Sequence, residues 1–270
     1  GSDDPSHRVL GGLKGRSPSN LRADTLGDWL KAKNPNHRVF AVSAKDRAAI
    51  TLAGVHPDGV YWYDSAQGRF TTSGYYEDQL PQYLRTFNGQ DPAVDGFMQG
   101  FPERWTHSTD GARADDYEGE DTRDERVSGH PLMQGTFEEI AKQVYASPFI
   151  DEATMELAQL MLIEEAIGQG AAMDLLSISL SATDTVGHLY GPRSAEAADS
   201  LARLDQMLGT FFSVLDERLG VNNYWVVLTA DHGVAELPEW THEINTLNCP
   251  SDTGRLTPES LYLGLNWHLY

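Results

Sequence analysis

The fold class follows from one stretch, Asp174-Leu175-Leu176-Ser177-Ile178-Ser179-Leu180. This short apolar run is typical of a strand buried in a parallel sheet. The polar, glycine-containing residues 181–192 come next and are expected to form a loop. Residues 194–219 then carry apolar side chains at spacings of three and four, which predicts a long helix that ends at Gly220. The order strand, loop, helix predicts an α/β protein.

Two further segments show an apolar run followed by a polar cluster. Tyr224-Trp225-Val226-Val227-Leu228-Thr229 predicts a second buried strand, closed by Ala230-Asp231-His232-Gly233. Arg38-Val39-Phe40-Ala41-Val42-Ser43 is a weaker case, followed by Ala44-Lys45-Asp46-Arg47. In open α/β sheets, ligand-binding groups gather beyond the carboxyl ends of the strands. We therefore expect these clusters to share one edge of a mostly parallel sheet flanked by helices.

The chain length bounds the domain organisation. A chain of 270 residues is long enough for one α/β domain with a smaller cap. Residues 107–130 are rich in Asp, Glu, Arg and Gly and poor in apolar residues, which predicts an exposed insertion loop. We interpret residues 1–270 as one partial domain with a cap or insertion region at about 55–135. Further helices are predicted near residues 21–31, 79–87, 136–145 and 152–167.

Charge and composition exclude several classes of function. The formal net charge of −20 repels a phosphate backbone and argues against a general nucleic-acid binder. An anionic substrate would need local positive charge, from metal ions or from placed Lys and Arg. No stretch approaches the roughly 18–20 apolar residues of a membrane span. The single cysteine, Cys249, excludes an intrachain disulfide and a cysteine-cluster metal site.

Asp184 and His188 are candidate metal ligands. They lie four residues apart directly after the first predicted strand. A carboxylate and an imidazole at this spacing can converge on one ion if the chain turns, and Gly187 makes a turn easier. On spacing alone, a helix-capping Asp beside a surface His is the commoner explanation.

Asp231 and His232 form a second candidate pair. Adjacent residues point in different directions, so the two side chains can serve two ions, or one ion and its neighbour. A charged pair after so apolar a run needs partners when it is partly buried. The alternative is a turn Asp beside a solvated His. The two pairs together supply two carboxylates and two imidazoles, which suit zinc or a similar divalent ion.

Lys45 and Arg47 supply the positive charge that the composition otherwise withholds. An Arg guanidinium can hold two phosphate oxygens in a planar fork, and a Lys ammonium acts as a point charge. In isolation, a solvated loop is the simpler explanation of a Lys-x-Arg pair.

These motifs carry a resemblance to a known family. Ser181-Ala182-Thr183-Asp184-Thr185-Val186-Gly187-His188-Leu189-Tyr190-Gly191-Pro192 and Leu228-Thr229-Ala230-Asp231-His232-Gly233 resemble the two late metal-binding motifs of the alkaline phosphatase superfamily. Ser43-Ala44-Lys45-Asp46-Arg47-Ala48-Ala49-Ile50, followed by Tyr61-Trp62-Tyr63-Asp64, resembles its PafA-like phosphate monoesterase branch. The resemblance runs from about Asn20 to Leu237, and the three motifs occur in the family's order.

The resemblance implies an enzyme, a two-zinc metallohydrolase that cleaves small-molecule phosphate monoesters through a phosphorylated Thr or Ser. Asp184 and His188 would bind one Zn²⁺, and Asp231 and His232 would contribute to the other. The Lys and Arg pair would contact the non-bridging phosphate oxygens, and diesterase relatives lack it. The resemblance also implies a periplasmic or extracellular location.

The chain departs from the family's pattern at both ends. The family's nucleophile, its first metal-binding Asp and an Asn that contacts phosphate lie upstream of the first motif seen here. Its last zinc-binding His lies well beyond the Asp-His-Gly motif, and neither His242 nor His268 has a matching context. We therefore expect little activity from this chain alone. The alternatives are a phosphodiesterase, nucleotide pyrophosphatase or sulfatase of the same superfamily, and a non-catalytic binding module with the inherited fold.

Overall fold

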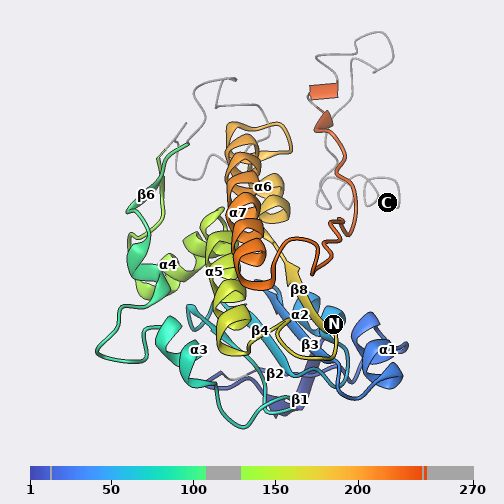
Figure 1. The fold of residues 1–270 in the computed structure, drawn as a ribbon. Coiled ribbons are helices and arrows are strands. Elements are labelled where there is room, and N and C mark those ends of the chain that lie inside the picture. Colours follow the sequence, from blue (N-terminus) through green and yellow to red (C-terminus); the bar gives the residue numbers. More distant parts are fainter. Residues whose placement is uncertain (13, 108–128, 239, 242–270) are drawn as a thin grey trace, which may run out of the picture.

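The structure is a computed structural model that describes residues 1–12, 14–107, 129–238 and 240–241. At its centre lies a four-stranded sheet (Figure 1). The strand order is β5-β4-β3-β8. The bounds are Arg38–Ser43 for β3, Gly59–Asp64 for β4, Arg69–Thr71 for β5 and Asp174–Ser179 for β8. Strand β3 pairs in parallel with β4 and with β8, and β5 pairs antiparallel to β4. The expected mostly parallel sheet is confirmed.

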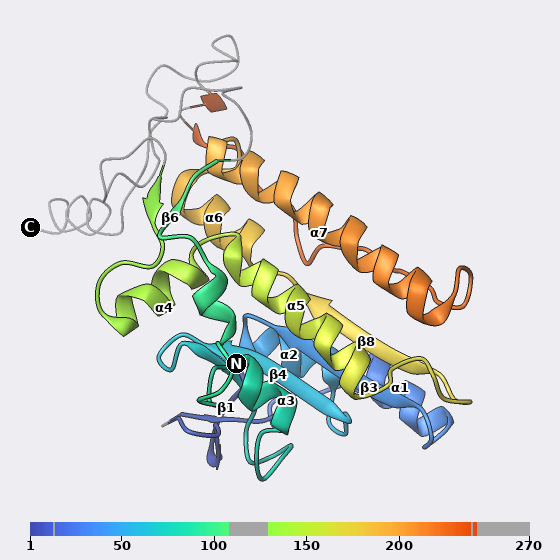
Figure 2. The same ribbon diagram turned by 60° about the vertical axis from the view of Figure 1, so that its left-hand side comes forward.

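Helices cover both faces of this sheet. The helices are α1 (Leu26–Lys33), α2 (Asp46–Ala53), α3 (Gln82–Phe87), α4 (Phe137–Tyr145), α5 (Phe149–Glu164), α6 (Ala182–Tyr190) and α7 (Ala195–Leu219), with a 3₁₀ turn at Phe97–Gly100. Two small ladders join β1 (Asp3–Arg8) to β2 (Gly15–Arg16) and β6 (Arg104–Trp105) to β7 (His130–Pro131). Helices α1 and α2 lie on one face, and α5 lies on the other with α7 outside it (Figure 2).

The alternation of side chains along β3 builds the two cores. Phe40 and Val42 pack on the α5 side, in the same cluster as Leu157 of α5. Ala41 points the other way, into a cluster with Ile50 of α2. All five side chains are at most 1% exposed. Because successive residues of a strand face opposite sides, one apolar run can be buried on both faces.

Local caps explain where the predicted helices begin. Ser194 accepts a hydrogen bond from the Ala197 backbone N–H, and α7 ends at Gly220, whose φ is +85°. Thr136 and Glu139 form a reciprocal capping box at the start of α4. The predicted helix at residues 194–219 is confirmed. None of the described helices is both long enough and apolar enough to cross a membrane.

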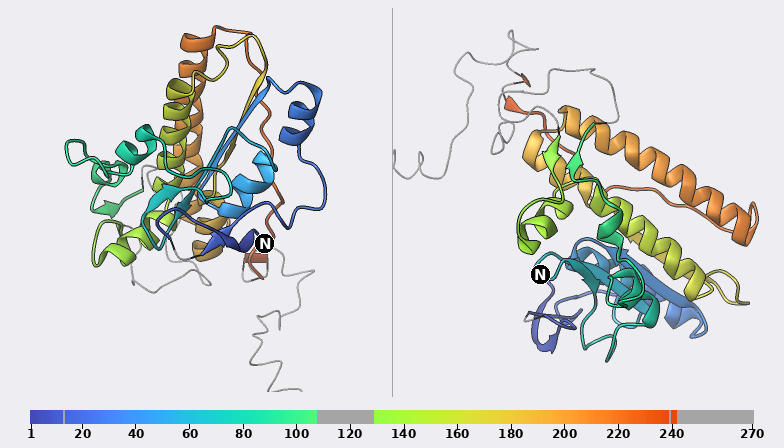
Figure 3. Two further views of the ribbon diagram at one scale, coloured as in Figure 1. Left: turned by 90° about the horizontal axis from the view of Figure 1, so that it is seen from below. Right: turned by 90° about the vertical axis from the view of Figure 1, so that its left-hand side faces the viewer.

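The expected buried strand at residues 224–229 is wrong. The segment runs back along α7 in extended form, and no strand of the described ranges pairs with it (Figure 3). Trp225 is 94% exposed, Val227 88% and Leu228 77%. An apolar run encodes a preference for burial, but a strand also needs a neighbour for its backbone N–H and C=O groups. The pattern in the sequence does not specify that neighbour.

Two other segments differ from expectation. Residues 182–190 form helix α6 where a loop was expected. Strands β4 and β5 fall within the range 55–135 and pair into the central sheet, and the domain division stays a prediction. The insertion residues 108–128 lie outside the described residues. The described residues that flank them, His107 and His130, are not exposed: their side chains are 9% and 4% exposed.

Candidate active site at the ends of β3 and β8

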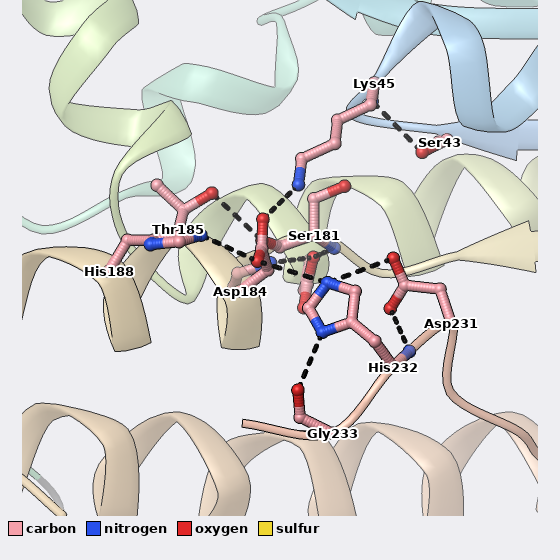
Figure 4. A network of polar contacts seen from close by, with 11 residues as sticks. Ser43, Lys45, Ser181, Asp184, Thr185, His188, Asp231, His232 and Gly233 are labelled. Atoms are coloured by element: carbon pink, nitrogen blue, oxygen red, sulfur yellow. Dashed lines mark hydrogen bonds and ion pairs between the residues drawn. The ribbon is translucent and has the colours of Figure 1, made fainter. Parts of the chain in front are cut away.

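Strands β3 and β8 deliver two candidate residues to the same edge of the sheet. The strands pair in register, with Ser43 opposite Ser179. Lys45 follows β3 as the N-cap of α2, and its backbone N–H donates to Ser43 Oγ at 3.0 Å. Asp184 lies in the first turn of α6. The Lys45 Nζ forms an ion pair with Asp184 Oδ2 (Figure 4).

Helix α6 presents Asp184 and His188 on one face. Residues four apart on a helix are neighbours, and His188 Nε2 lies 3.2 Å from Asp184 Oδ1. The helix, rather than a turn at Gly187, brings the two side chains together. The side chain of Asp184 is 29% exposed and that of His188 is 79% exposed, so the imidazole stands at an open surface.

His232 reaches the same carboxylate from the segment that follows α7. Its Nε2 lies 4.0 Å from Asp184 Oδ1 and 3.5 Å from Asp231 Oδ2 (Figure 4). Its Nδ1 lies 3.0 Å from the backbone carbonyl oxygen of Gly233. A proton on Nδ1 can donate to that carbonyl, which leaves the Nε2 lone pair directed at the two carboxylates. This is the tautomer in which a histidine binds a metal through Nε2.

The electrostatics of Asp184 suit a metal ligand. The hydrogen bond from Lys45 is the main cause that lowers the pKa of Asp184 below its ordinary value. Burial is the next largest effect and opposes the hydrogen bond, and the charges of Lys45, His188 and His232 lower this pKa further. Asp184 is therefore ionised at neutral pH, which is the form that coordinates a cation.

A buried residue of α5 fixes the start of α6. Asp151 Oδ1 accepts hydrogen bonds from the backbone N–H groups of Ser181 at 2.7 Å and Ala182 at 3.0 Å. The first N–H groups of a helix have no partner within it, so Asp151 caps α6 and orients Asp184. Burial raises the pKa of Asp151 to about 7. Sequence reasoning missed this residue, whose one signal is an acid within the apolar stripe of residues 149–164.

Arg47 joins Lys45 along a basic cleft of about 170 Å³, which Lys14 and Arg16 also line. Arg16 forms an ion pair with Asp46, another lining residue. This concentration of cations is notable in a chain of net charge −20. Sequence reasoning missed Lys14 and Arg16, although they repeat the Lys-x-Arg spacing of Lys45 and Arg47.

A larger cavity, of about 710 Å³, lies between α3 and α5 and contains none of the predicted site residues. Four of its lining residues carry carboxylates: Asp95, Glu152, Glu156 and Glu164. Carboxylates repel an anionic substrate. The smaller basic cleft is therefore the better candidate for phosphate binding.

Four of the predicted site residues lie about the carboxylate of Asp184 or beside it. We call Asp184, His188, Asp231 and His232 the strand-end site. His188 and His232 each lie against Asp184, and Asp231 contacts His232. Carboxylates and imidazoles are a donor set that suits zinc or another divalent cation. His242 and His268 lie outside the described residues.

Known proteins share this sequence pattern. The sequence model of the type I phosphodiesterase / nucleotide pyrophosphatase family matches residues 14–262. Alkaline phosphatase PhoV of Synechococcus elongatus is 38% identical over 82% of this chain and 41% of its own length. Alkaline phosphatase PafA of Elizabethkingia meningoseptica is 36% identical over 81% of this chain and 41% of its own length. The chain thus spans less than half the length of these curated relatives.

Solved structures share the fold. The crystal structure of wild-type PafA matches 90% of this chain and 48% of its own, with a TM-score of 0.78 at 30% identity. A PafA variant matches 98% of this chain and 52% of its own, with a TM-score of 0.81 at 28% identity. Two of the four substitutions in that variant replace a Lys and an Arg two positions apart by Ala. Lys45 and Arg47 have the same spacing.

Proposed function

Because the chain belongs to the type I phosphodiesterase / nucleotide pyrophosphatase family, as a PafA-like relative in the alkaline phosphatase superfamily, we propose that its full-length parent is a metal-dependent phosphate monoesterase. One observation carries the proposal: the ion pair of Lys45 with Asp184, beside two imidazoles and a basic cleft. This arrangement combines ligands for a cation with positive charge for an anion.

The strand-end site is proposed to hold the metal ions. Asp184 and His188 would hold one Zn²⁺, and Asp231 and His232 would contribute to a second. Two bound zinc ions in such a site supply an activated nucleophile and stabilise the leaving-group oxygen. Asp151 keeps Asp184 oriented through the start of α6. The Gly233 carbonyl holds His232 with Nε2 toward the carboxylates.

Lys45 and Arg47 are proposed to contact the non-bridging phosphate oxygens. A phosphate monoester carries one more negative charge than a diester at alkaline pH, so two cations favour the monoester. Fixed cations also offset the charge on the equatorial oxygens of the transferring phosphoryl group. The proposed phosphorylated intermediate forms on a Thr or Ser of the parent that this chain does not identify.

The test compares two substrates. We expect the zinc-loaded full-length parent to release phosphate from an aryl phosphate monoester faster than it cleaves the matching diester. Lys45→Ala and Arg47→Ala should each lower monoester turnover more than diester turnover. A parent that cleaves the diester faster contradicts the roles of these residues, and a phosphodiesterase, nucleotide pyrophosphatase or sulfatase then becomes the better assignment.

We further propose that the 270-residue chain alone has little or no turnover, in line with its span of less than half of its relatives. Zinc-dependent turnover by the chain alone would contradict this. The rival from another class, a non-catalytic binding module, is tested by metal content: the enzyme parent should hold two zinc ions, and a binding module need hold none. A periplasmic or extracellular location is also proposed, and cell fractionation of the parent tests it.

A further inference from the structure

A second group of metal-ligating side chains lies about the β6–β7 ladder, separate from the strand-end site. His107 follows β6, His130 belongs to β7, and Glu196 lies in the first turn of α7. The ladder pairs Trp105 with His130, which brings the two histidines to one place. One ligand atom from each of the three side chains lies within 4.8 Å of the others.

The distances within this group are close to those of a coordination sphere. Glu196 Oε1 lies 2.7 Å from His130 Nε2 and 3.6 Å from His107 Nε2. Ligand atoms that bind a tetrahedral zinc at about 2.1 Å lie about 3.4 Å apart. The contact with His107 already matches this separation, and the contact with His130 has to lengthen by about 0.7 Å. A small side-chain rotation is enough for that.

Burial makes the carboxylate of Glu196 costly without a cation. The side chain of Glu196 is 1% exposed. Among the described residues, its second oxygen, Oε2, has no hydrogen-bond partner. A buried carboxylate oxygen without a partner is strongly unfavourable. A divalent cation would satisfy that oxygen and balance the charge.

Arg203, whose charge acts on His107, is paired with other carboxylates. Arg203 donates to Asp199 Oδ2 at 2.7 Å and to Glu152 Oε1 at 3.1 Å. The Trp105 indole N–H donates to Asp199 Oδ2 at 2.8 Å. These contacts hold Trp105 and Asp199 in place beside the three residues. Trp105 is 1% exposed and Asp199 is fully buried. Among the described residues, Glu196 pairs with the two imidazoles.

We propose that His107, His130 and Glu196, here called the insertion site, bind a structural divalent cation that ties the β6–β7 ladder to α7. Two imidazole nitrogens and one carboxylate oxygen suit Zn²⁺. The low exposure of all three side chains favours a structural role over a catalytic one. The alternative is a hydrogen-bonded His–Glu network that holds no metal.

The experiment isolates this site by removing the other. The chain carrying Asp184→Ala and His232→Ala is equilibrated with Zn²⁺, passed through gel filtration and analysed by mass spectrometry for metal. We expect about one zinc per chain, which Glu196→Gln or His107→Asn should each abolish. His56→Asn, at an exposed histidine, is the matched control and should keep the zinc. No zinc in the starting chain, or zinc unchanged by both substitutions, would overturn the proposal.

Two readouts keep the test informative if a variant folds poorly. The starting chain loaded with Co²⁺ should show the visible absorption of a tetrahedral nitrogen and oxygen site. A chelator should lower its unfolding temperature by several degrees, since a ligand that binds the folded state stabilises it. The same chelator should not lower the unfolding temperature of the Glu196→Gln variant. An equal shift in that variant, or no cobalt absorption, would also overturn the proposal.

Discussion

The strand-end site and the insertion site use the same types of side chain and differ in access. In the strand-end site, His188 is 79% exposed and His232 is 58% exposed. In the insertion site, the corresponding exposures are 9% for His107 and 4% for His130. Catalytic metal sites keep a position open for substrate, and structural sites are closed. The comparison teaches that access, more than residue type, assigns a role to a His and carboxylate cluster.

The two sites also differ in the frame that holds them. The residues of the insertion site lie at the β6–β7 ladder and at the start of the 25-residue helix α7. The strand-end site rests on two parallel strands but takes Asp231 and His232 from a segment without strand pairing in the described residues. Two of its four proposed ligands therefore lie on a segment that no described strand supports. The predictions below test this difference, from the largest expected effect to the smallest.

Asp184→Ala should have the largest effect, because Lys45, His188 and His232 all lie against this carboxylate. A bound metal supplies several kcal/mol of transition-state stabilisation, so monoester turnover of the parent should fall by about 10³-fold or more. Steady-state kinetics with an aryl phosphate measures this. Asp24→Asn, at an exposed aspartate, serves as the control. Turnover within tenfold of wild type would remove Asp184 from the site.

Lys45→Ala should lower monoester turnover of the parent by about 10²–10³-fold, the usual effect of losing one fixed group that stabilises transition-state charge. The zinc content should not fall, because Lys45 is not a proposed ligand. Lys142→Ala removes a lysine that pairs with Glu138 on the surface, and it should leave turnover unchanged. Equal effects of the two substitutions would contradict the role of Lys45.

Asp151→Asn should change how stability depends on pH. Burial raises the pKa of Asp151 to about 7 from an ordinary 3.8. The contribution of protonated Asp151 to the free energy of unfolding is complete below pH 3.8 and is lost as the pH rises through about 7. The free energy of unfolding falls by up to about 1.4 kcal/mol per pH unit in this range. The Asn variant keeps an acceptor for the α6 N–H groups and should lose this slope. Urea unfolding at pH 5, 6 and 7 measures both proteins, and identical slopes would contradict the assignment.

Val227→Ala should have the smallest effect, a change in the free energy of unfolding within about 0.5 kcal/mol, because the side chain is 88% exposed. Val42→Ala, in the fully buried part of β3, is the matched comparison and should cost more than about 2 kcal/mol. Chemical denaturation of the chain measures both values. A cost at Val227 as large as that at Val42 would place residues 224–229 in a core after all.

Local patterns in the sequence predicted the central elements well. The apolar run of β3 and the apolar stripe of α7 are local signals, and the structure confirms both elements. Gly187 and the polar residues around it favour a turn and predict a loop at 182–190, whereas the structure forms a helix there. The cap from Asp151, 30 residues away, helps to make it a helix.

The sequence does not predict which distant segments lie together in the fold. Tyr224 to Thr229 has the composition of a buried strand, but composition does not select a pairing partner. His130 and Glu196 lie 66 residues apart, so no local spacing connects them. The strand-end residues could be grouped in advance because each follows an apolar run, and the ends of parallel strands share an edge.

Zinc-edge anomalous scattering from crystals of the full-length parent grown with Zn²⁺ tests the central claim most directly. The account predicts a zinc peak at about 2.0–2.2 Å from a carboxylate oxygen of Asp184 and a second peak beside His232. A map with no zinc at Asp184, in which Lys45 keeps its ion pair with that carboxylate, would contradict it.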